Sequence, residues 1–307
     1  MNYAVLFGGQ GYHHPGMFDI IKDFSYAKPY LEEAAEFLQL SMKEVDDLLN
    51  EDILEDKYAQ PLLCTYAYAI WKSIEKSIPP PLVFTGFSLG EIAAYGCADS
   101  MDFKTLLHIS FKRALYIDNT TPKNIKIIAV MGITEKFISN LCEQTDTRIM
   151  IVSAEKHFSI AGYEKDINSL INLLHEKHPT AEVRDVALKI PSHTSFLASA
   201  SEQFKTELEK AELRNPKIPV LAGIDGRLVR NKNVAIRTLS AQISQTIHWY
   251  TCYKNASERG AELFLEISPG VILTKMVHRE NPRFITNSTA SFNTINGIIS
   301  WINKYIR

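Results

Sequence analysis

Cysteine is scarce in this chain, and its four cysteines are scattered along the sequence. None belongs to a Cys-x-x-Cys pair, so the spacing indicates neither a zinc site nor a disulfide framework. We expect all four to be reduced thiols of a cytoplasmic protein. They are Cys64, Cys97, Cys142 and Cys252. No bound metal or cofactor is expected.

Long apolar runs and a charge of one sign are also missing. No apolar run approaches the roughly 18 residues needed to cross a bilayer, and the N-terminus, MNYAVLFGGQG, has no basic region or cleavage site typical of a signal peptide. The formal net charge of −2 gives no general attraction to nucleic acid or to an anionic membrane. We therefore expect neither nucleic acid nor membrane as a partner.

What is present is the composition of an ordinary globular enzyme, with 46% hydrophobic and 22% charged residues in 307. Apolar residues at helical spacing predict a core helix over 59–78, ended by three prolines that lack the amide hydrogen. A buried strand is expected over 82–85 and a further helix over about 239–259. The pattern predicts an α/β fold: an α/β-hydrolase-like large domain with a mostly parallel sheet.

The middle of the chain follows a different order. Strands are predicted over 126–132, 148–153, 158–162 and 182–188, and helices over 134–144 and 164–175. This βαββαβ order is the ferredoxin-like arrangement. We therefore predict a large α/β domain of residues 1–123 and 188–307, with an inserted ferredoxin-like small subdomain of residues 124–187.

Residues 85–91, TGFSLGE, have the Gly-x-Ser-x-Gly spacing of a nucleophile elbow. The motif arises by chance in long sequences, but here it stands between a predicted strand and a predicted helix, as an elbow requires. A serine hydroxyl is a poor nucleophile unless the backbone directs it outward and a base takes its proton. The context favours Ser88 as a working nucleophile.

The base must come from nine histidines, and the residue pattern alone leaves the choice open. Eight of them are explained equally well as surface or half-buried side chains. His193 lies in KIPSHTSFL, a proline-stiffened loop just after the predicted subdomain. A loop at a domain junction can hold a side chain over a cleft, so His193 is the candidate base.

Two further features bear on substrate binding. The sequence around Arg113 by itself favours a solvent-exposed residue on a helix. The alternative hypothesis is that its guanidinium forms two hydrogen bonds to a substrate carboxylate. An oxyanion needs two donors, which the backbone amides of Leu89 and of Gln10, in FGGQGY, could supply. A phosphate site at this glycine-rich loop is disfavoured because no GxxxxGK[ST] is present.

Six segments together resemble the malonyl-CoA:acyl carrier protein transacylase family, in order over nearly the whole chain. They are LFGGQGYHHPGM, AQPLLCTYAYAIW, GFSLGE, an arginine 25 residues after the serine (113 − 88), PSHTSFL and FLEISPG. Within the family, LAGIDGRLVR, QISQTIHW and the GFS elbow look closest to the malonyltransferase (epsilon) subunit of malonate decarboxylase.

The resemblance implies a ping-pong transfer. Ser88, activated by His193, takes malonyl from malonyl-CoA as an ester, and the phosphopantetheine-type thiol of an acyl carrier protein subunit collects it. Arg113 would pair with the free malonyl carboxylate. The resemblance also assigns a pocket role to Gln60 and the orientation of the histidine to a backbone carbonyl near Gln242. Other malonate decarboxylase subunits would be possible partners.

Departures from the family pattern concern acyl selection. Phe87 stands where fatty-acid-synthesis members usually have histidine, Gly8 where they have proline, and VSAEKHFSIAG where they have an NSP-like segment. Phe87 is expected to lie at the substrate pocket. These differences favour malonate decarboxylase over the alternative, a transacylase of fatty-acid or polyketide synthesis.

Two hypotheses from other functional classes compete with acyl transfer. A serine hydrolase or thioesterase would use the same elbow, and a non-enzymatic docking subunit would keep a vestigial site. The arginine at family spacing disfavours the first, and the joint presence of Gln10, Ser88, Arg113 and His193 disfavours the second.

Overall fold

The computed structural model describes residues 1–22, 24–51 and 54–306, and its centre is a six-stranded sheet. The strand order is β10-β9-β1-β2-β7-β8, and every described pairing in it is parallel except β7 with β8. The strands are β1 (Asn2–Phe7), β2 (Val83–Gly86), β7 (Val220–Leu221), β8 (Leu228–Val229), β9 (Ala261–Ile267) and β10 (Ile285–Ser288). The mostly parallel sheet predicted from the sequence is confirmed.

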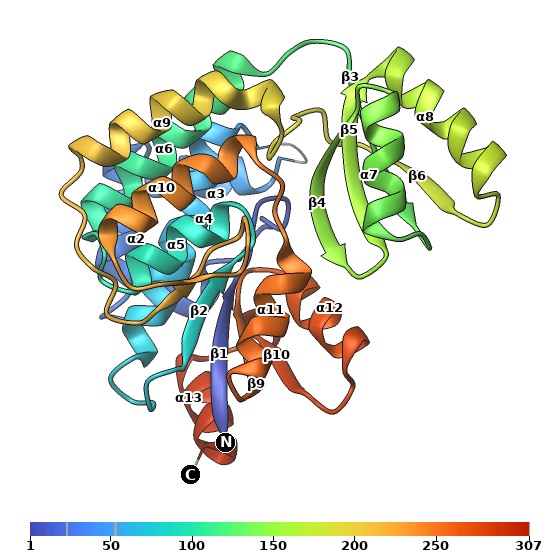
Figure 1. Cartoon of the computed structure of the whole chain (residues 1–307). Helices are drawn as coiled ribbons and strands as arrows, with labels where there is room; N and C mark the ends of the chain where they lie inside the picture. Colours follow the sequence, from blue (N-terminus) through green and yellow to red (C-terminus); the bar gives the residue numbers. More distant parts are fainter. Residues whose placement is uncertain (23, 52–53, 307) are drawn as a thin grey trace.

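Helices cover both faces of this sheet (Figure 1). Residues of β1 alternate between two cores: Tyr3, Val5 and Phe7 face one, and Ala4 and Leu6 face the other. The helices of the first core are α1 (Asp19–Lys22), α2 (Lys28–Phe37), α3 (Met42–Leu49), α4 (Asp56–Ile74), α5 (Leu89–Cys97), α6 (Phe103–Thr120), α9 (Ala198–Lys210), α10 (Lys232–Ser244) and α13 (Ile295–Tyr305). Those of the second are α11 (Trp249–Glu258) and α12 (Ile272–Glu280). Burial on both faces is typical of parallel sheets.

A second, four-stranded antiparallel sheet lies to one side of the large one, with α7 and α8 packed on it (Figure 1). Its order is β4-β5-β3-β6, the ferredoxin-like arrangement predicted from the sequence. The elements are β3 (Ile125–Met131), α7 (Glu135–Gln144), β4 (Arg148–Ala154), β5 (His157–Tyr163), α8 (Glu164–Lys177) and β6 (Glu182–Val186). The predicted boundaries, 124 and 187, fall next to the first and last residues of this sheet.

The prolines do not end the core helix, contrary to the prediction. Helix α4 stops at Ile74, and a turn closed by the Ser77 amide and the Ile74 carbonyl (2.8 Å) follows it. A proline also pushes the residue before it out of the helical region, so the chain must leave the helix ahead of Ile78. The three prolines therefore carry the chain from this turn into β2.

The single helix predicted over 239–259 is also wrong, because the chain breaks into α10 and α11. Gln245 is extended (φ −126°, ψ 145°), and Ile247 pairs with Ile151 of β4 in an isolated parallel bridge. The Ile247 amide donates to Met150 (3.0 Å) and its carbonyl accepts from Val152 (2.8 Å). Pairing with the small sheet thus overrides the helical pattern.

Two glycines allow the first turn of α5 to approach β1 and β2. A Cβ on Gly90 would lie 2.1 Å from the carbonyl oxygen of Phe7, and one on Gly86 would lie 2.1 Å from the amide nitrogen of Glu91. Both distances are far inside contact. Only glycine permits this close packing of strand, bend and helix.

We therefore expect Gly90→Ala to lower the free energy of unfolding by about 1–3 kcal/mol or more, because α5 must move away from β1. Urea denaturation measures this change. Gly297→Ala in α13 is the control: its Cβ would lie 3.3 Å from the nearest side-chain atom, so the change should stay within about 1 kcal/mol. A Gly90→Ala midpoint equal to that of the wild type would contradict the close-packing argument.

Candidate active site

Ser88 stands in the bend between β2 and α5, at the carboxyl edge of the large sheet. Its backbone has φ 55° and ψ −113°, a conformation that side-chain-bearing residues rarely adopt. Such strain costs of order 1–3 kcal/mol and concentrates at functional sites. The bend presents the half-buried hydroxyl to the groups that converge on it.

His193 lies against this hydroxyl, with 2.9 Å between its Nε2 and Ser88 Oγ. Its backbone also has positive φ (66°), and its side chain is 2% exposed. Nδ1 is 2.5 Å from the backbone carbonyl oxygen of Gln242. Because a carbonyl only accepts, Nδ1 carries the proton and Nε2 is free to take one.

Burial lowers the pKa of His193 to about 3. The hydrogen bond to the Gln242 carbonyl opposes this shift, and the nearby Arg113 charge adds to it. The imidazole is therefore neutral at physiological pH. It begins any reaction as a base.

Arg113 is buried inside the site, 1% exposed, and is not the solvated helix residue that its sequence context alone suggests. From α6, Nη1 donates to Gln60 Oε1 (3.0 Å), and Nη2 donates to Ser88 Oγ (3.2 Å) and Gln242 Oε1 (3.4 Å). Burial lowers its pKa to about 10, so the guanidinium is still a cation at neutral pH. Its Nε is buried and has no protein partner among the described residues.

Gln60 and Gln10 extend this network to Asp56. Gln60 Nε2 donates to Gln10 Oε1 (3.1 Å), and Gln10 Nε2 donates to Asp56 Oδ1 (2.9 Å). Asp56 lies one turn before Gln60 on α4 and also accepts from Gln60 Nε2 (3.4 Å). One carboxylate therefore fixes the direction of both amides.

Gln242, at the end of α10, reaches several groups at once. Its carbonyl holds His193, its Oε1 accepts from Arg113, and its Nε2 donates to the carbonyl of Ser88 (3.1 Å). The same Nε2 donates to Glu91 Oε2 (2.6 Å). Gln242 therefore joins the base, the cation and the nucleophile segment.

The two backbone donors predicted for an oxyanion are the amides of Gln10 and Leu89. Leu89 is the first residue of α5, where amides have no partner within the helix. Neither amide donates to a protein acceptor in the part of the chain that the structure describes. A helix N-terminus also favours developing negative charge.

Phe87 lies beside the nucleophile but outside this network. Its ring packs edge-on against Trp249, with 5.6 Å between centroids, and a Cβ on Gly9 would lie 3.2 Å from its Cδ1. The ring therefore packs against the second core, which contains Trp249. The structure shows its place and leaves its role in acyl selection a prediction.

The structure thus joins Ser88, His193, Arg113, Gln60 and Gln242 in one hydrogen-bonded network, with Gln10 attached through its side chain. Two members were not foreseen. Asp56 stands four residues before Gln60, which places both on one face of a helix. Glu91 directly follows the Gly-x-Ser-x-Gly motif and reads from sequence as an ordinary acid in a first helical turn.

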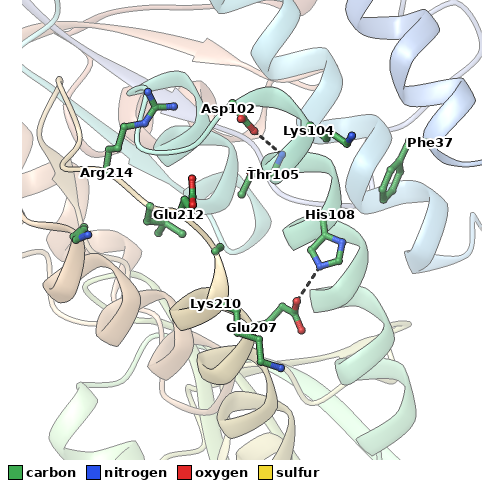
Figure 2. A pocket seen from close by; sticks show the side chains of 12 residues that line it. Phe37, Asp102, Lys104, Thr105, His108, Glu207, Lys210, Glu212 and Arg214 are labelled. Carbon is green, nitrogen blue, oxygen red and sulfur yellow. Dashed lines mark hydrogen bonds and ion pairs between the residues drawn. The ribbon is translucent and has the colours of Figure 1, made fainter.

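A large surface pocket elsewhere contains none of the predicted site residues. It measures about 940 Å³ and lies between α6, α9 and the start of α10. Figure 2 shows His108 paired with Glu207 there, and Asp102 capping the first turn of α6. The lining residues are Phe37, Asp102, Lys104, Thr105, His108, Glu207, Lys210, Ala211, Glu212, Leu213, Arg214 and Lys232. None of them forms a nucleophile–base pair, so we place the chemistry at Ser88.

Two other kinds of site find no support within residues 1–22, 24–51 and 54–306. No group of three or more histidine, cysteine, aspartate or glutamate side chains is arranged to hold a metal ion. No helix in these ranges has the length and apolar character to cross a membrane.

Comparison with known proteins finds similar sequences over most of the chain. The family model described as acyl transferase domain matches residues 19–288. A relative in Haemophilus influenzae, named malonyl CoA-acyl carrier protein transacylase, is 26% identical over 307 residues and covers 95% of this chain and 97% of that protein.

Solved structures of the same kind superpose closely. The malonyl CoA-acyl carrier protein transacylase from Coxiella burnetii has a TM-score of 0.90 at 22% identity, covering 100% of this chain and 98% of that one. A malonyl-transacylase in complex with its type II polyketide synthase acyl carrier protein has a TM-score of 0.89 at 22% identity, covering 99% and 100%. These structures share the fold described above.

The contact between His193 and Ser88 predicts how fast the serine reacts with a general reagent. His193→Ala should slow the modification of Ser88 by a fluorophosphonate by about 10²–10⁴-fold, because the hydroxyl loses its proton acceptor. Intact-protein mass spectrometry over time measures the rate. His108→Ala, which removes a histidine on the distant surface pocket, is the matched control and should react like the wild type. Near-normal rates in His193→Ala would point to another base.

Proposed function

This chain belongs to the acyl transferase domain family, and from that premise we propose that it moves malonyl groups from coenzyme A to the thiol of an acyl carrier protein. One observation carries the proposal: Ser88 Oγ lies 2.9 Å from a neutral imidazole and 3.2 Å from a buried guanidinium. The first activates a nucleophile. The second selects an acyl group that ends in a carboxylate.

In the first half-reaction, Ser88 Oγ attacks the thioester carbonyl of malonyl-CoA while His193 Nε2 takes its proton. The amides of Gln10 and Leu89 bind the oxyanion that forms. When the carbon–sulfur bond breaks, the imidazolium returns the proton to the leaving thiolate. The product is a malonyl ester on Ser88 and free coenzyme A.

The second half-reaction runs in reverse on a different thiol. The phosphopantetheine-type thiol gives its proton to His193 Nε2 and attacks the ester carbonyl. The carbon–oxygen bond breaks, and Ser88 Oγ regains a proton from the imidazolium. Each step is balanced by the histidine alone, so the reaction needs no cofactor.

The guanidinium suits the free end of a malonyl group. Arg113 is held by neutral oxygens of Gln60, Ser88 and Gln242, and among the described residues its Nε has no hydrogen-bond partner. Hydrogen bonds to neutral oxygens leave the positive charge uncompensated by direct contact. A substrate carboxylate would supply the missing anion beside this buried guanidinium.

Such a carboxylate would also strengthen the base. The charge of Arg113 is one of the causes that depress the pKa of His193. Neutralising that charge raises the pKa of the imidazole and makes proton removal from Ser88 more favourable. Malonyl-CoA would then activate the site better than acetyl-CoA.

The comparisons favour acceptors of the fatty-acid or polyketide type over malonate decarboxylase. The relatives named above are transacylases, and one is seen with a polyketide synthase acyl carrier protein. Two of the three segments that suggested the decarboxylase, LAGIDGRLVR and QISQTIHW, contain Gly223, Gln242 and Ile247. Because these residues build the scaffold of the site, we infer that they report on its geometry more than on the acceptor.

A serine hydrolase would use the same serine and histidine, and the two activities differ in what removes the acyl group. A hydrolase loses the ester to water. A transferase keeps it until a thiol arrives.

We therefore expect malonyl-CoA alone to leave a stable malonyl adduct on Ser88, seen by peptide mass spectrometry and missing in Ser88→Ala. Addition of a carrier protein bearing phosphopantetheine should discharge it. Carrier proteins of fatty-acid synthesis, polyketide synthesis and malonate decarboxylase are compared side by side, and the first two are expected to react faster. An adduct at another residue would sink the transferase proposal, and rapid loss to water without a carrier would favour the hydrolase.

Arg113→Ala should lower kcat/KM for malonyl-CoA about 10–100-fold more than for acetyl-CoA, because only the malonyl group loses a charge-assisted pair of about 1.5–3 kcal/mol. Arg113→Lys is the matched control, since it keeps the charge without the planar fork. It should recover part of the preference. Equal losses on both donors would contradict the clamp.

A further inference from the structure

Glu91 is a buried acid directly behind the nucleophile. It is 0% exposed and lies in the first turn of α5. Its Oε2 accepts two hydrogen bonds, from Gln242 Nε2 (2.6 Å) and from the backbone amide of Gly223 (3.0 Å). Its Oε1 has no hydrogen-bond partner among the described residues.

The contact with Glu91, together with those to the Ser88 carbonyl and to Arg113, sets which way the side-chain amide of Gln242 points. Because the carboxylate only accepts, Nε2 must face Glu91 and Oε1 must face Arg113 Nη2. With the amide reversed, Oε1 would oppose the carboxylate and Nε2 would oppose the guanidinium. Both contacts would become repulsive.

The backbone of the same glutamine holds the base. We propose that Glu91 is a positioning residue: through Gln242 and Gly223 it fixes the carbonyl that orients His193 and the oxygen that holds Arg113. This inference rests on the proposed acyl transfer at Ser88.

Through Gly223, Glu91 makes a second contact near the segment that joins α10 to α11. The Gly223 carbonyl accepts from the His248 amide (2.8 Å), and a Cβ on Gly223 would lie 2.8 Å from Glu91 Oε2. His248 is the N-cap residue of α11, just beyond the helix break that follows α10. The Glu91 carboxyl group thus contacts the side chain of Gln242, before the helix break, and the amide of Gly223, whose carbonyl holds His248 after the break.

The ionisation of Glu91 offers a direct readout. Burial raises its pKa to about 7, while the hydrogen bonds from Gln242 and Gly223 and the charge of Arg113 oppose the rise. Asp225 disfavours the anion further. Tyr95 and Cys252 also lie in its field, and burial raises the pKa of each far above neutrality. Burial holds the pKa of His193 far below 7 in the substrate-free site, so Glu91→Gln is the variant that tells whether a change in rate near pH 7 comes from Glu91 or from the base.

The experiment compares two variants of similar size in the full chain. Glu91→Gln keeps an oxygen that can accept from Gln242 and Gly223, whereas Glu91→Leu removes the acceptor. The rate of malonyl transfer to Ser88 is measured from pH 5 to 9, with the fluorophosphonate reaction of Ser88 in parallel. The Nδ1 proton of His193 is followed by NMR on histidine-labelled protein.

We expect Glu91→Leu to slow acylation about 10–100-fold and to shift or broaden the His193 Nδ1 proton. Glu91→Gln, which is neutral at every pH, should react like the wild type at pH 5 across the whole range and keep that resonance. In the wild type the rate should rise as pH increases through about 7, since the anion holds Gln242 more firmly than the neutral acid does. That rise should vanish in Glu91→Gln.

Three results would overturn the inference: wild-type rates in Glu91→Leu, equal losses in both variants, or a rise near pH 7 that persists in Glu91→Gln. If Glu91→Leu fails to fold, Gln242→Met cuts the same link from the other side and keeps the backbone carbonyl; it should show the same rate loss and NMR change. A wild type that forms no malonyl adduct would instead refute the proposed function, while the fluorophosphonate series would still test Glu91.

Discussion

The hydrogen bond between His193 Nδ1 and the Gln242 carbonyl is the contact on which the site depends. It fixes the tautomer that leaves Nε2 facing Ser88, and it does so with a group that cannot ionise. A carboxylate in that position would stabilise the imidazolium and hold the histidine partly protonated. A carbonyl stabilises the imidazolium less than a carboxylate would. The effect of burial on the pKa of His193 therefore outweighs that of the hydrogen bond, and the base stays neutral.

Arg113, the buried cation, is likewise positioned by hydrogen bonds to uncharged groups. Arg113 is surrounded by amide and hydroxyl oxygens, and Asp56 acts on it through Gln10 and Gln60 without forming an ion pair with it in the described structure. An ion pair inside the protein would satisfy the guanidinium completely and leave a substrate carboxylate little to gain. Neutral oxygens fix its direction and preserve its charge for the substrate.

Sequence reasoning succeeded where the signal is local. The elbow glycines, the βαββαβ order and the mostly parallel sheet all follow from short motifs and periodicity. It failed at 245–248, where ordinary residues are pulled out of a helix by pairing with Ile151 more than ninety positions away. The burial of Arg113 was equally invisible, since its partners come from three separate segments. Glu91 was overlooked because a first-turn acid has a sufficient local explanation.

The bridge between Ile151 and Ile247 has a mechanical consequence. It joins the small sheet by backbone hydrogen bonds to the segment that follows Gln242, so this segment belongs to both parts of the molecule. A displacement of the small sheet would therefore be transmitted through the two hydrogen bonds of Ile247 to the backbone just after the carbonyl that holds the imidazole.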